Sequence, residues 1–291
     1  MKKVIAFILA LTMAFALTGC KSSDYKSAVK AMEDGDYAAA VRQLETLDDY
    51  RDSRQLLKQC RYALAVESFN AGDYESALEI FKDLGDYIDA ANYVVRAQDG
   101  LLRRHIAGGW HSDVLDVTDL FLAGAESQME GITEGLKEHD LSLKITLNCT
   151  FAEDGTCSVA GTIDDLDGFL EKLNAFFRDL MEKTLESEFA AEGLTMDEVY
   201  AALEVTSMDE LFQAVAGMTL QEFLDSIQIR ELIEMALEEL KYEGTFTIED
   251  GTILCNGDKL QYNAETDTLE LLANEEGKEL LGVDSLSMSR N

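Results

Sequence analysis

The spacing of apolar and polar residues changes along the chain and divides it into regions. Residues 4–17 are almost continuously apolar, and residues 24–104 carry apolar and small residues at helical spacing. Residues 106–163 and 242–291 contain short stretches in which apolar and polar positions alternate, as in half-buried strands. Residues 164–241 return to the helical period. The pattern predicts an α+β protein in which a β domain is interrupted by a helical insertion.

The helical region 24–104 repeats itself with a period of 37 residues. A fixed period near this length, with small and aromatic residues at helical spacing, is typical of stacked helix pairs. Gly35 and Gly72 are expected to end one helix with a positive φ, and Asp36 and Asp73 to cap the next. The other matching positions are Tyr25 and Tyr62, Ala28 and Ala65, Tyr37 and Tyr74, Ala40 and Ala77, and Leu47 and Leu84.

The second copy resembles tetratricopeptide repeats, because it reads Tyr62-x-x-Ala65-x-x-x-Phe69-x-x-Gly72-Asp73-Tyr74-x-x-Ala77-x-x-x-Phe81. The period is longer than in that family, the chain has no proline to close the repeat, and a third copy is limited to a leading helix over 89–104. The resemblance implies a groove that docks proteins or peptides; the alternative is a rigid stalk. The candidate docking face consists of Tyr25, Tyr37, Tyr62, Phe69 and Tyr74.

The alternating stretches are separated by turn residues typical of β-hairpins. Residues 141–151 and 157–163 flank Asp154-Gly155, while Asp250-Gly251 and Asn256-Gly257 separate strands later in the chain. Short strands with such turns predict an antiparallel meander that curls into a barrel or sandwich. Residues 114–122 fit either a strand or a short helix. The predicted later strands are 242–248, 252–255, 259–263, 268–272 and 285–289.

The β region resembles lipocalin-like domains of bacterial lipoproteins. The resemblance is carried by Gly108-Gly109-Trp110, by the successive hairpins and by a final strand that ends near Arg290. It implies that a small apolar ligand binds in the barrel, with Trp110 as a ligand contact or as a plug at one end. The alternative is a generic small sheet in which Trp110 only closes one end.

The insertion at 164–241 carries 20 acidic and 5 basic residues. One amphipathic helix is expected over 165–189, and three capping-box patterns predict further helix starts at Thr195, Ser207 and Thr219. The apolar faces either pack on one another and on the sheet or form a lid or docking surface. In the second case the adaptable contacts are Met196, Met208, Met218 and Met235.

The beginning of the chain has the features of an export signal. Lys2 and Lys3 precede the apolar run 4–17, which is too short to span a membrane as a helix. Leu17-Thr18-Gly19-Cys20 then resembles the bacterial lipobox, which implies removal of residues 1–19 and lipid attachment to Cys20. We therefore expect an extracytoplasmic lipoprotein of the cell envelope, anchored to the cell membrane by lipid. The alternatives are an ordinary secretory signal with a chance cysteine, or an uncleaved anchor.

Charge and cysteine content limit the classes of partner and the disulfide bonds that we expect. The chain has 57 Asp and Glu against 24 Lys and Arg, so its surface repels phosphate backbones and nucleic acid is not expected as a partner. Cys149 and Cys157 flank a predicted hairpin turn and either form a disulfide or remain buried thiols, and Cys60 is read as a core residue.

The sequence contains no arrangement of residues that indicates an enzyme. His105, His111 and His139 lack ligand-spaced partners, and no nucleophile or phosphate-binding motif is present. We therefore expect no cofactor, no metal and no catalytic activity; enzyme action on wall material is retained only because carboxylates abound. The expected function is docking of proteins or peptides, or scaffolding, through the repeats. The alternative is binding of a small apolar ligand in the β domain.

Overall fold

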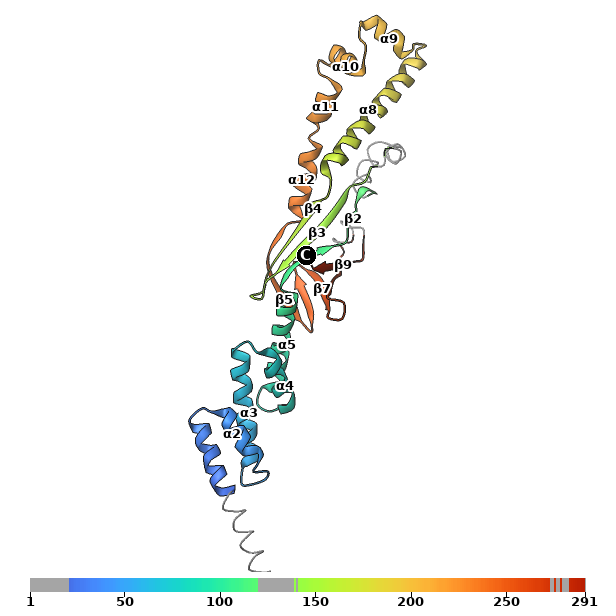
Figure 1. Ribbon diagram of the computed structural model, residues 1–291. Helices are drawn as coiled ribbons and strands as arrows, with labels where there is room; N and C mark the ends of the chain where they lie inside the picture. The colour runs from blue at the N-terminus through green and yellow to red at the C-terminus, as the bar shows by residue number, and fades with distance from the viewer. Residues whose placement is uncertain are drawn as a thin grey trace, which may run out of the picture. The chain divides into compact units, whose positions relative to one another are not determined.

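The computed structural model describes residues 21–119, 139, 141–272, 275, 278 and 283–290. The predicted signal at 1–19 and the lipid site Cys20 lie outside these described residues. Contacts within the chain divide it between His105 and Ile106 into two compact units. The first unit is helical, and the second contains a β-barrel and further helices (Figure 1). This organisation confirms the predicted α+β class.

The helices of the first unit begin and end where the repeat predicts. The Asp36 carboxylate accepts a hydrogen bond from the backbone N–H of Ala39 at 2.9 Å. The Asp73 carboxylate accepts the equivalent bond from Ser76 at 3.2 Å. The preceding glycines, Gly35 and Gly72, have φ values of 78° and 79°. The helical segments are residues 21–33, α2 (Tyr37–Glu45), α3 (Ser53–Asn70), α4 (Tyr74–Leu84) and α5 (Ala90–Ile106).

Side chains and packing also recur at intervals of 37 residues. The hydroxyl of Tyr25 donates a hydrogen bond to the Asp52 carboxylate at 2.6 Å. In the second copy, the hydroxyl of Tyr62 donates to Asp89 in the same way. The small residues that let neighbouring helices approach are buried in both copies, as are the leucines after α2 and at the end of α4. These pairs are Ala28 and Ala65, Ala40 and Ala77, and Leu47 and Leu84.

Ile88 holds a left-handed backbone conformation, with a φ of 54°. This conformation crowds any side chain and is especially unfavourable for a β-branched one. The Ile88 side chain is 68% exposed, so little packing would be lost on its removal. We expect Ile88→Gly to raise the free energy of unfolding of the first unit by about 1 kcal/mol.

Urea unfolding of the full chain, followed by far-ultraviolet circular dichroism, measures the effect of Ile88→Gly. Ile88→Ala is the matched control, because it removes the branched side chain but keeps a Cβ. We expect the increase in the free energy of unfolding from Ile88→Ala to be less than half of the increase from Ile88→Gly. Equal gains from both variants would show that the backbone conformation at Ile88 is not the cause.

The second unit contains a closed antiparallel barrel. Its strands follow the order β1-β9-β8-β7-β6-β5-β4-β3, and β3 pairs back with β1 to close the circle of eight. The short strand β2 pairs with β3 outside this circle. The strands are β1 (Gly108–Ser112), β2 (Leu115–Asp116), β3 (Lys144–Phe151), β4 (Thr156–Ile163), β5 (Tyr242–Glu249), β6 (Thr252–Cys255), β7 (Asp258–Asn263), β8 (Thr268–Leu272) and β9 (Ser285–Arg290).

The later hairpins turn at the residue pairs that the sequence indicated. Asp250 and Gly251 have φ values of 49° and 77°, and Asn256 and Gly257 have values of 52° and 84°. Two successive positive φ values match the twist of the flanking strands, which is why Asp-Gly and Asn-Gly are favoured there. The strands predicted after residue 241 are therefore confirmed.

Strand β1 is the element that the alternation of residues did not indicate. Two of its five residues are glycines, which have low strand propensity. It forms because it has a partner on each side: Trp110 lies opposite Cys149 of β3 and opposite Arg290 of β9. In the ambiguous stretch 114–122, Leu115–Asp116 forms β2, and residues 120–122 lie outside the described part.

Apolar residues that alternate along the strands fill the inside of the barrel. Trp110, Ile253 and Leu269 are completely buried. The rings of Phe151 and Phe246 meet edge to face, with their centroids 5.4 Å apart. Other strongly buried residues of these strands are Leu147, Cys149, Cys157, Cys255, Leu260, Leu286 and Met288.

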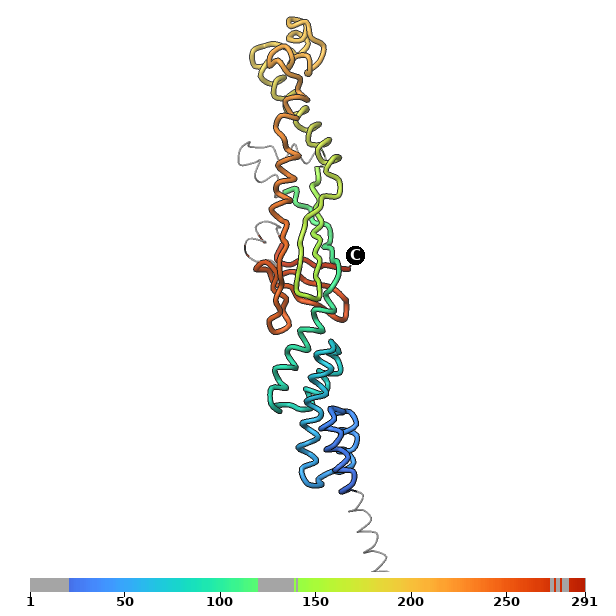
Figure 2. The backbone as a smooth tube through the Cα atoms, turned by 90° about the vertical axis from the view of Figure 1, so that its left-hand side faces the viewer, coloured from blue at the N-terminus to red at the C-terminus, as the bar shows by residue number. Residues whose placement is uncertain are grey.

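The helical insertion lies between β4 and β5, as predicted. Figures 1 and 2 show α8 running away from β4 and α11 and α12 returning beside it. Phe169, Leu173 and Phe176 of α8 pack against Ile233 of α12, so the two ends of the insertion hold each other. Its helices are α8 (Leu166–Ala191), α9 (Met196–Leu203), α10 (Met208–Ala216), α11 (Leu220–Ser226) and α12 (Ile229–Glu239).

A glycine in β4 fixes the base of the insertion against the barrel. A Cβ at Gly161 would lie 3.1 Å from Cδ2 of Leu237 and 3.2 Å from Cδ1 of Leu240. Both distances are tighter than ordinary van der Waals contact, so a larger residue at this position would require the two leucine side chains to shift by a few tenths of an ångström. The close packing of α12 on β4 therefore uses the absence of a side chain at Gly161.

Candidate functional site

The aromatic residues of the predicted docking face are half-buried in the packing of the repeats. The Tyr25 ring lies 5.9 Å from that of Tyr50, and the Phe69 ring lies 5.3 Å from that of Tyr74. Tyr37 packs against the buried cluster around Ala40 and Leu44. Tyr62 makes edge contacts with Phe81, Tyr87 and Tyr93.

Arginines cover several of the same rings. The guanidinium of Arg96 lies 4.7 Å from the centroid of Phe69, and that of Arg104 lies 5.4 Å from the centroid of Tyr74. Arg51 lies 5.0 Å from the centroid of Tyr25. These cation–π contacts occupy ring faces that a docked peptide would use. The structure thus gives these aromatics a packing role, and docking on them stays a prediction.

Trp110 is buried inside the barrel, and the Arg290 guanidinium lies over its indole ring. The indole Nε1 donates a hydrogen bond to the carbonyl oxygen of Ile106 at 2.8 Å. The Arg290 guanidinium lies 4.4 Å from the indole centroid. Arg290 also donates to the Asp267 carboxylate at 2.8 Å and to the carbonyl of Ala107 at 3.1 Å. The two residues that carried the lipocalin resemblance are therefore in contact.

Capture of an apolar ligand predicts an apolar cavity inside the barrel. Two described cavities, of about 560 and about 320 Å³, open to the solvent between mainly polar and small residues. In the larger, Glu270 and Ser287 alternate with the buried Leu269 and Met288, so that cavity lies on the outer face. The smaller is lined by Thr150, Ala152, Thr156, Cys157, Ser158, Glu243 and Gly244.

The barrel places three cysteines close together on its inner face. Cys149 lies opposite Val159 across the β3–β4 hairpin, so it is out of register with Cys157. The Sγ of Cys157 lies 2.8 Å from that of Cys255. Burial raises the pKa of the Cys149 thiol to about 12. None of the four cysteines in the described part of the chain is joined in a disulfide.

The histidines take part in ordinary polar contacts. His139 Nε2 lies 3.2 Å from a carboxylate oxygen of Asp179, and His111 Nε2 lies 3.3 Å from the hydroxyl of Ser289. Across the residues that the structure describes, no group of three or more His, Cys, Asp and Glu residues is placed to hold a metal ion. Within the same residues, no helix has the length and hydrophobicity to cross a membrane.

The helical insertion carries the surface that sequence reasoning only partly identified. Eight of the eleven large hydrophobic side chains that are exposed in the described chain lie between residues 194 and 235. Residues 194–239 also contain eleven acidic residues and one basic residue, Arg230. Arg230 is itself paired with the carboxylates of Asp167 and Glu234.

Five of these exposed residues follow one another from the turn before α11 to the middle of α12, and we call them the insertion surface. Phe223 and Ile227 are four residues apart, and Leu232 and Met235 are three apart, so each pair shares one side of its helical segment. Leu232 is 56% exposed and Met235 is 60% exposed. The insertion surface consists of Met218, Phe223, Ile227, Leu232 and Met235.

The sequence signal for this surface was the presence of methionines on the apolar faces of the predicted helices. Met218 and Met235 are exposed, as adaptable contacts should be. Met208 is buried between the short helices, and Met196 packs at the edge of the same cluster. Periodicity did not separate these two groups, because a helical stripe has the same spacing whether or not another element covers it.

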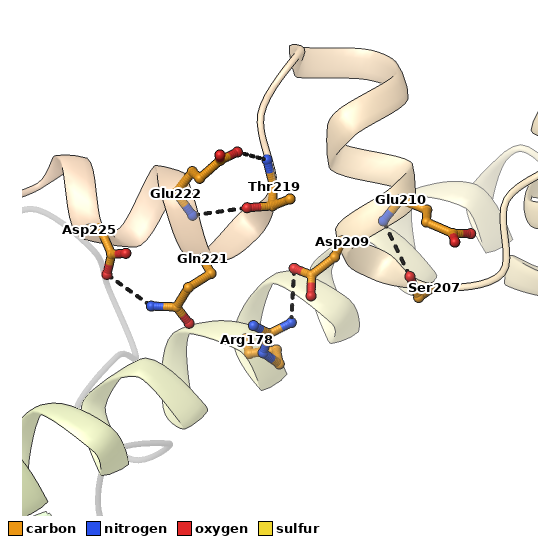
Figure 3. Close-up of polar contacts among 8 residues, drawn as sticks. All are labelled: Arg178, Ser207, Asp209, Glu210, Thr219, Gln221, Glu222 and Asp225. Carbon is orange, nitrogen blue, oxygen red and sulfur yellow. Dashed lines mark hydrogen bonds and ion pairs between the residues drawn. The ribbon is translucent and has the colours of Figure 1, made fainter.

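Local hydrogen bonds start α11, which presents part of this surface, and the neighbouring short helices α9 and α10 (Figure 3). At α11, Thr219 Oγ1 accepts from the backbone N–H of Glu222 at 3.1 Å, and the Glu222 carboxylate accepts from the N–H of Thr219 at 2.7 Å. Thr195 and Glu198 form the same reciprocal box at α9. These two predicted capping boxes are confirmed.

The third box differs from the prediction. Ser207 Oγ accepts from the backbone N–H of Glu210 at 3.2 Å. The Glu210 carboxylate, however, accepts from the backbone N–H of Thr206 at 2.6 Å and not from that of Ser207. Arg178 of α8 also donates to the Asp209 carboxylate at 3.2 Å, which ties the start of α10 to the long helix (Figure 3).

The hydrogen bonds at the starts of α9 and α10 predict that the stability of these helices depends on pH. Hydrogen bonds from Thr195 lower the pKa of Glu198, and hydrogen bonds from Thr206 lower that of Glu210. A carboxylate with a lowered pKa in the folded state adds stability above its unfolded pKa, about 4.3, and loses it as the pH falls through the folded value. We therefore expect α9 and α10 to lose amide protection below about pH 4.

Hydrogen exchange of the full chain between pH 6 and pH 3, corrected for intrinsic rates, measures this loss. The control is the double variant Glu198→Gln and Glu210→Gln, whose amide oxygens still accept the same bonds but do not titrate. The pH dependence at α9 and α10 should shrink in this variant. An unchanged pH profile would assign the effect to other carboxylates.

No protein-family model matches the chain, and neither the curated proteins nor the solved structures include a match to it.

Proposed function

We propose that this protein is a non-enzymatic docking protein of the bacterial cell envelope. In this proposal, lipid on Cys20 holds the chain at the outer side of the cell membrane. The observation that carries the docking role is the insertion surface, where exposed Phe, Ile, Leu and Met side chains lie on consecutive helices. Exposed apolar side chains that gather on one element mark interaction sites more often than scattered ones do.

The expected partner segment is a basic amphipathic helix of another protein. Apolar side chains at helical spacing fit the apolar face of a partner helix, and methionines adapt to different side chains. The eleven acidic residues of 194–239, against one arginine, favour a partner rich in Lys and Arg. The same charge disfavours an anionic membrane surface.

In this proposal the tetratricopeptide-like repeats are a spacer or a secondary docking element. Tyr25, Tyr62 and Phe69 are engaged in the packing of the repeats, which supports the spacer role. The alternative of an apolar ligand in the lipocalin-like barrel has weaker support. Trp110, Ile253 and Leu269 fill the interior where that ligand would bind.

The test uses synthetic peptides and the full chain. The probe is a helical 18-residue peptide of Leu and Lys with one apolar face, labelled for fluorescence anisotropy. We expect binding near micromolar Kd, and about tenfold weaker binding when Leu232 and Met235 are both changed to Ser, since a tenfold change is about 1.4 kcal/mol.

Three controls separate docking from charge attraction. A scrambled peptide of the same composition has no apolar face and should bind at least about tenfold more weakly. A Leu and Glu peptide should not bind. Val95→Ser removes an exposed apolar side chain from α5, outside the insertion, and should leave binding unchanged. Equal binding of the helical and scrambled basic peptides, or no effect of the Leu232 and Met235 changes, would overturn the proposed docking surface.

A further inference from the structure

The inner face of the barrel brings together two sulfur atoms that lie 98 residues apart in sequence. Cys157 of β4 and Cys255 of β6 stand on either side of β5, with their Sγ atoms 2.8 Å apart. Cys157 lies opposite Gly244 of β5, and Cys255 lies opposite Phe246. The inner face of a closed barrel is concave, so side chains from strands two apart lean toward one another. Gly244 itself has no side chain, and the ring of Tyr242 lies over it.

We infer that Cys157 and Cys255 form a disulfide in the exported protein and that Cys149 remains a thiol. A disulfide has an S–S length of about 2.05 Å, so the two sulfurs need to approach by less than about 1 Å. Because β5 lies between the two strands, the backbones of β4 and β6 must also draw together to reach the Cα separation of about 4.4–6.8 Å that a disulfide requires. Cys149 is set two positions along the hairpin from the residue that faces Cys157, which makes it the poorer partner. The inference concerns the barrel. It rests on the proposed location in the cell envelope and is independent of docking at the insertion surface.

The reaction is a thiol–disulfide exchange with an oxidised donor, such as a disulfide oxidoreductase of the envelope or oxidised glutathione. The Cys157 thiolate attacks one donor sulfur, forms a mixed disulfide and releases the other donor sulfur as a thiolate. The Cys255 thiolate then attacks the Cys157 sulfur and releases the second donor thiol. The donor is reduced by two electrons, and both cysteine protons pass to solvent or to the donor thiols.

Access and acidity indicate when this exchange takes place. Cys157 and Cys255 are both buried on the inner face, so a donor does not reach either thiol in the closed barrel. Burial and the contact with Cys157 raise the pKa of Cys255, which keeps its thiolate scarce in the closed barrel. Exchange is therefore expected during folding, before β4, β5 and β6 are packed.

The bond would cross the base of the helical insertion. The insertion leaves the barrel after β4 and returns at β5, so the loop closed by Cys157 and Cys255 contains all of α8 to α12. A cross-link that closes a loop of this length restricts the unfolded chain strongly. It would hold the barrel together where the insertion interrupts the meander.

The first experiment maps cysteines in the full chain exported to its own envelope, alkylated without reduction and digested. We expect one linked peptide pair that contains Cys157 and Cys255, with Cys149 alkylated only after denaturation. A linked pair of Cys149 and Cys157, or alkylation of all three without reduction, would overturn the inference.

The second experiment measures thermal unfolding of the full chain refolded with oxidised glutathione. We expect the double variant Cys157→Ser and Cys255→Ser to lower the barrel midpoint by about 10 °C, and reductant to remove most of that difference. Cys149→Ser is the matched control and should keep the same sensitivity to reductant. If reductant does not change the wild-type midpoint, the bond is absent from the folded protein. Peptide binding at the insertion surface is scored separately, so either proposal can fail alone.

Discussion

Trp110→Ala is expected to lower the free energy of unfolding of the barrel by about 4 kcal/mol. The indole is completely buried and is the largest side chain inside the second unit. Its removal leaves a cavity, deprives the Ile106 carbonyl of its donor and takes away the ring beneath Arg290. The loss is concentrated at the strand that closes the barrel, because β1 pairs with both β3 and β9.

Hydrogen exchange resolved to the strands is the appropriate measurement, because the chain contains two compact units and has only one tryptophan. We expect the slowest amides of β3 and β9 to exchange about a thousandfold faster in Trp110→Ala. Val114→Ala is a control at an exposed position just after β1 and should change exchange by less than about threefold. Unchanged protection of β3 and β9 would mean that closure of the barrel does not depend on Trp110.

Cys20→Ala is expected to remove the lipid from the protein and to weaken its membrane attachment at least about tenfold after an alkaline wash. The lipobox resemblance implies two acyl chains on this cysteine, and two chains anchor a protein stably where one does not. Residues 4–17 would remain uncleaved in the variant, but they are too short to span the membrane as a helix.

Intact-protein mass spectrometry of the membrane fraction measures the effect of Cys20→Ala directly. Wild-type protein should begin at Cys20 and carry the lipid mass, while the variant should retain residues 1–19 and carry none. Ser22→Ala, two residues away, should behave as wild type. A wild-type protein that begins at Met1 without lipid would remove the basis for placing the chain at the membrane.

Sequence pattern predicted the repeats and the later strands because both depend on local features. Gly35 and Asp36 recur as Gly72 and Asp73, and each pair makes the same turn and cap. Asn256-Gly257 specifies a turn through its own backbone preferences. Features of this kind need no information from distant parts of the chain.

The parts that sequence pattern did not predict depend on non-local pairing. Strand β1 exists because β3 and β9 lie on either side of it, although they are far apart in sequence. The cysteine pairing illustrates the same point: the hairpin turn made Cys157 the nearest candidate for Cys149, whereas the barrel brings Cys157 to Cys255. Register across several strands decides such contacts.

The insertion surface was only partly identified, for a different reason. Met208, Met218 and Met235 were all expected as adaptable contacts, yet Met208 is covered by its neighbours and the other two are exposed. Exposure is a property of how α8 to α12 pack on each other, and a residue period does not report it. The aromatic residues of the repeats illustrate the same limit, because the sequence placed Tyr62 on a candidate docking face and did not indicate that its ring packs among Phe81, Tyr87 and Tyr93.

The contact of Gly161 with Leu237 and Leu240 bears on how this architecture can diversify. The strands that flank the insertion, β4 and β5, pair directly with each other, so residues 164–241 connect them as a long hairpin loop would. A relative or an engineered chain can therefore exchange this segment as a cassette while the host barrel keeps its register. A graft that omits the end of α12 would leave Gly161 without the two leucine side chains that pack on it, so the smallest segment to transfer includes Leu237 and Leu240.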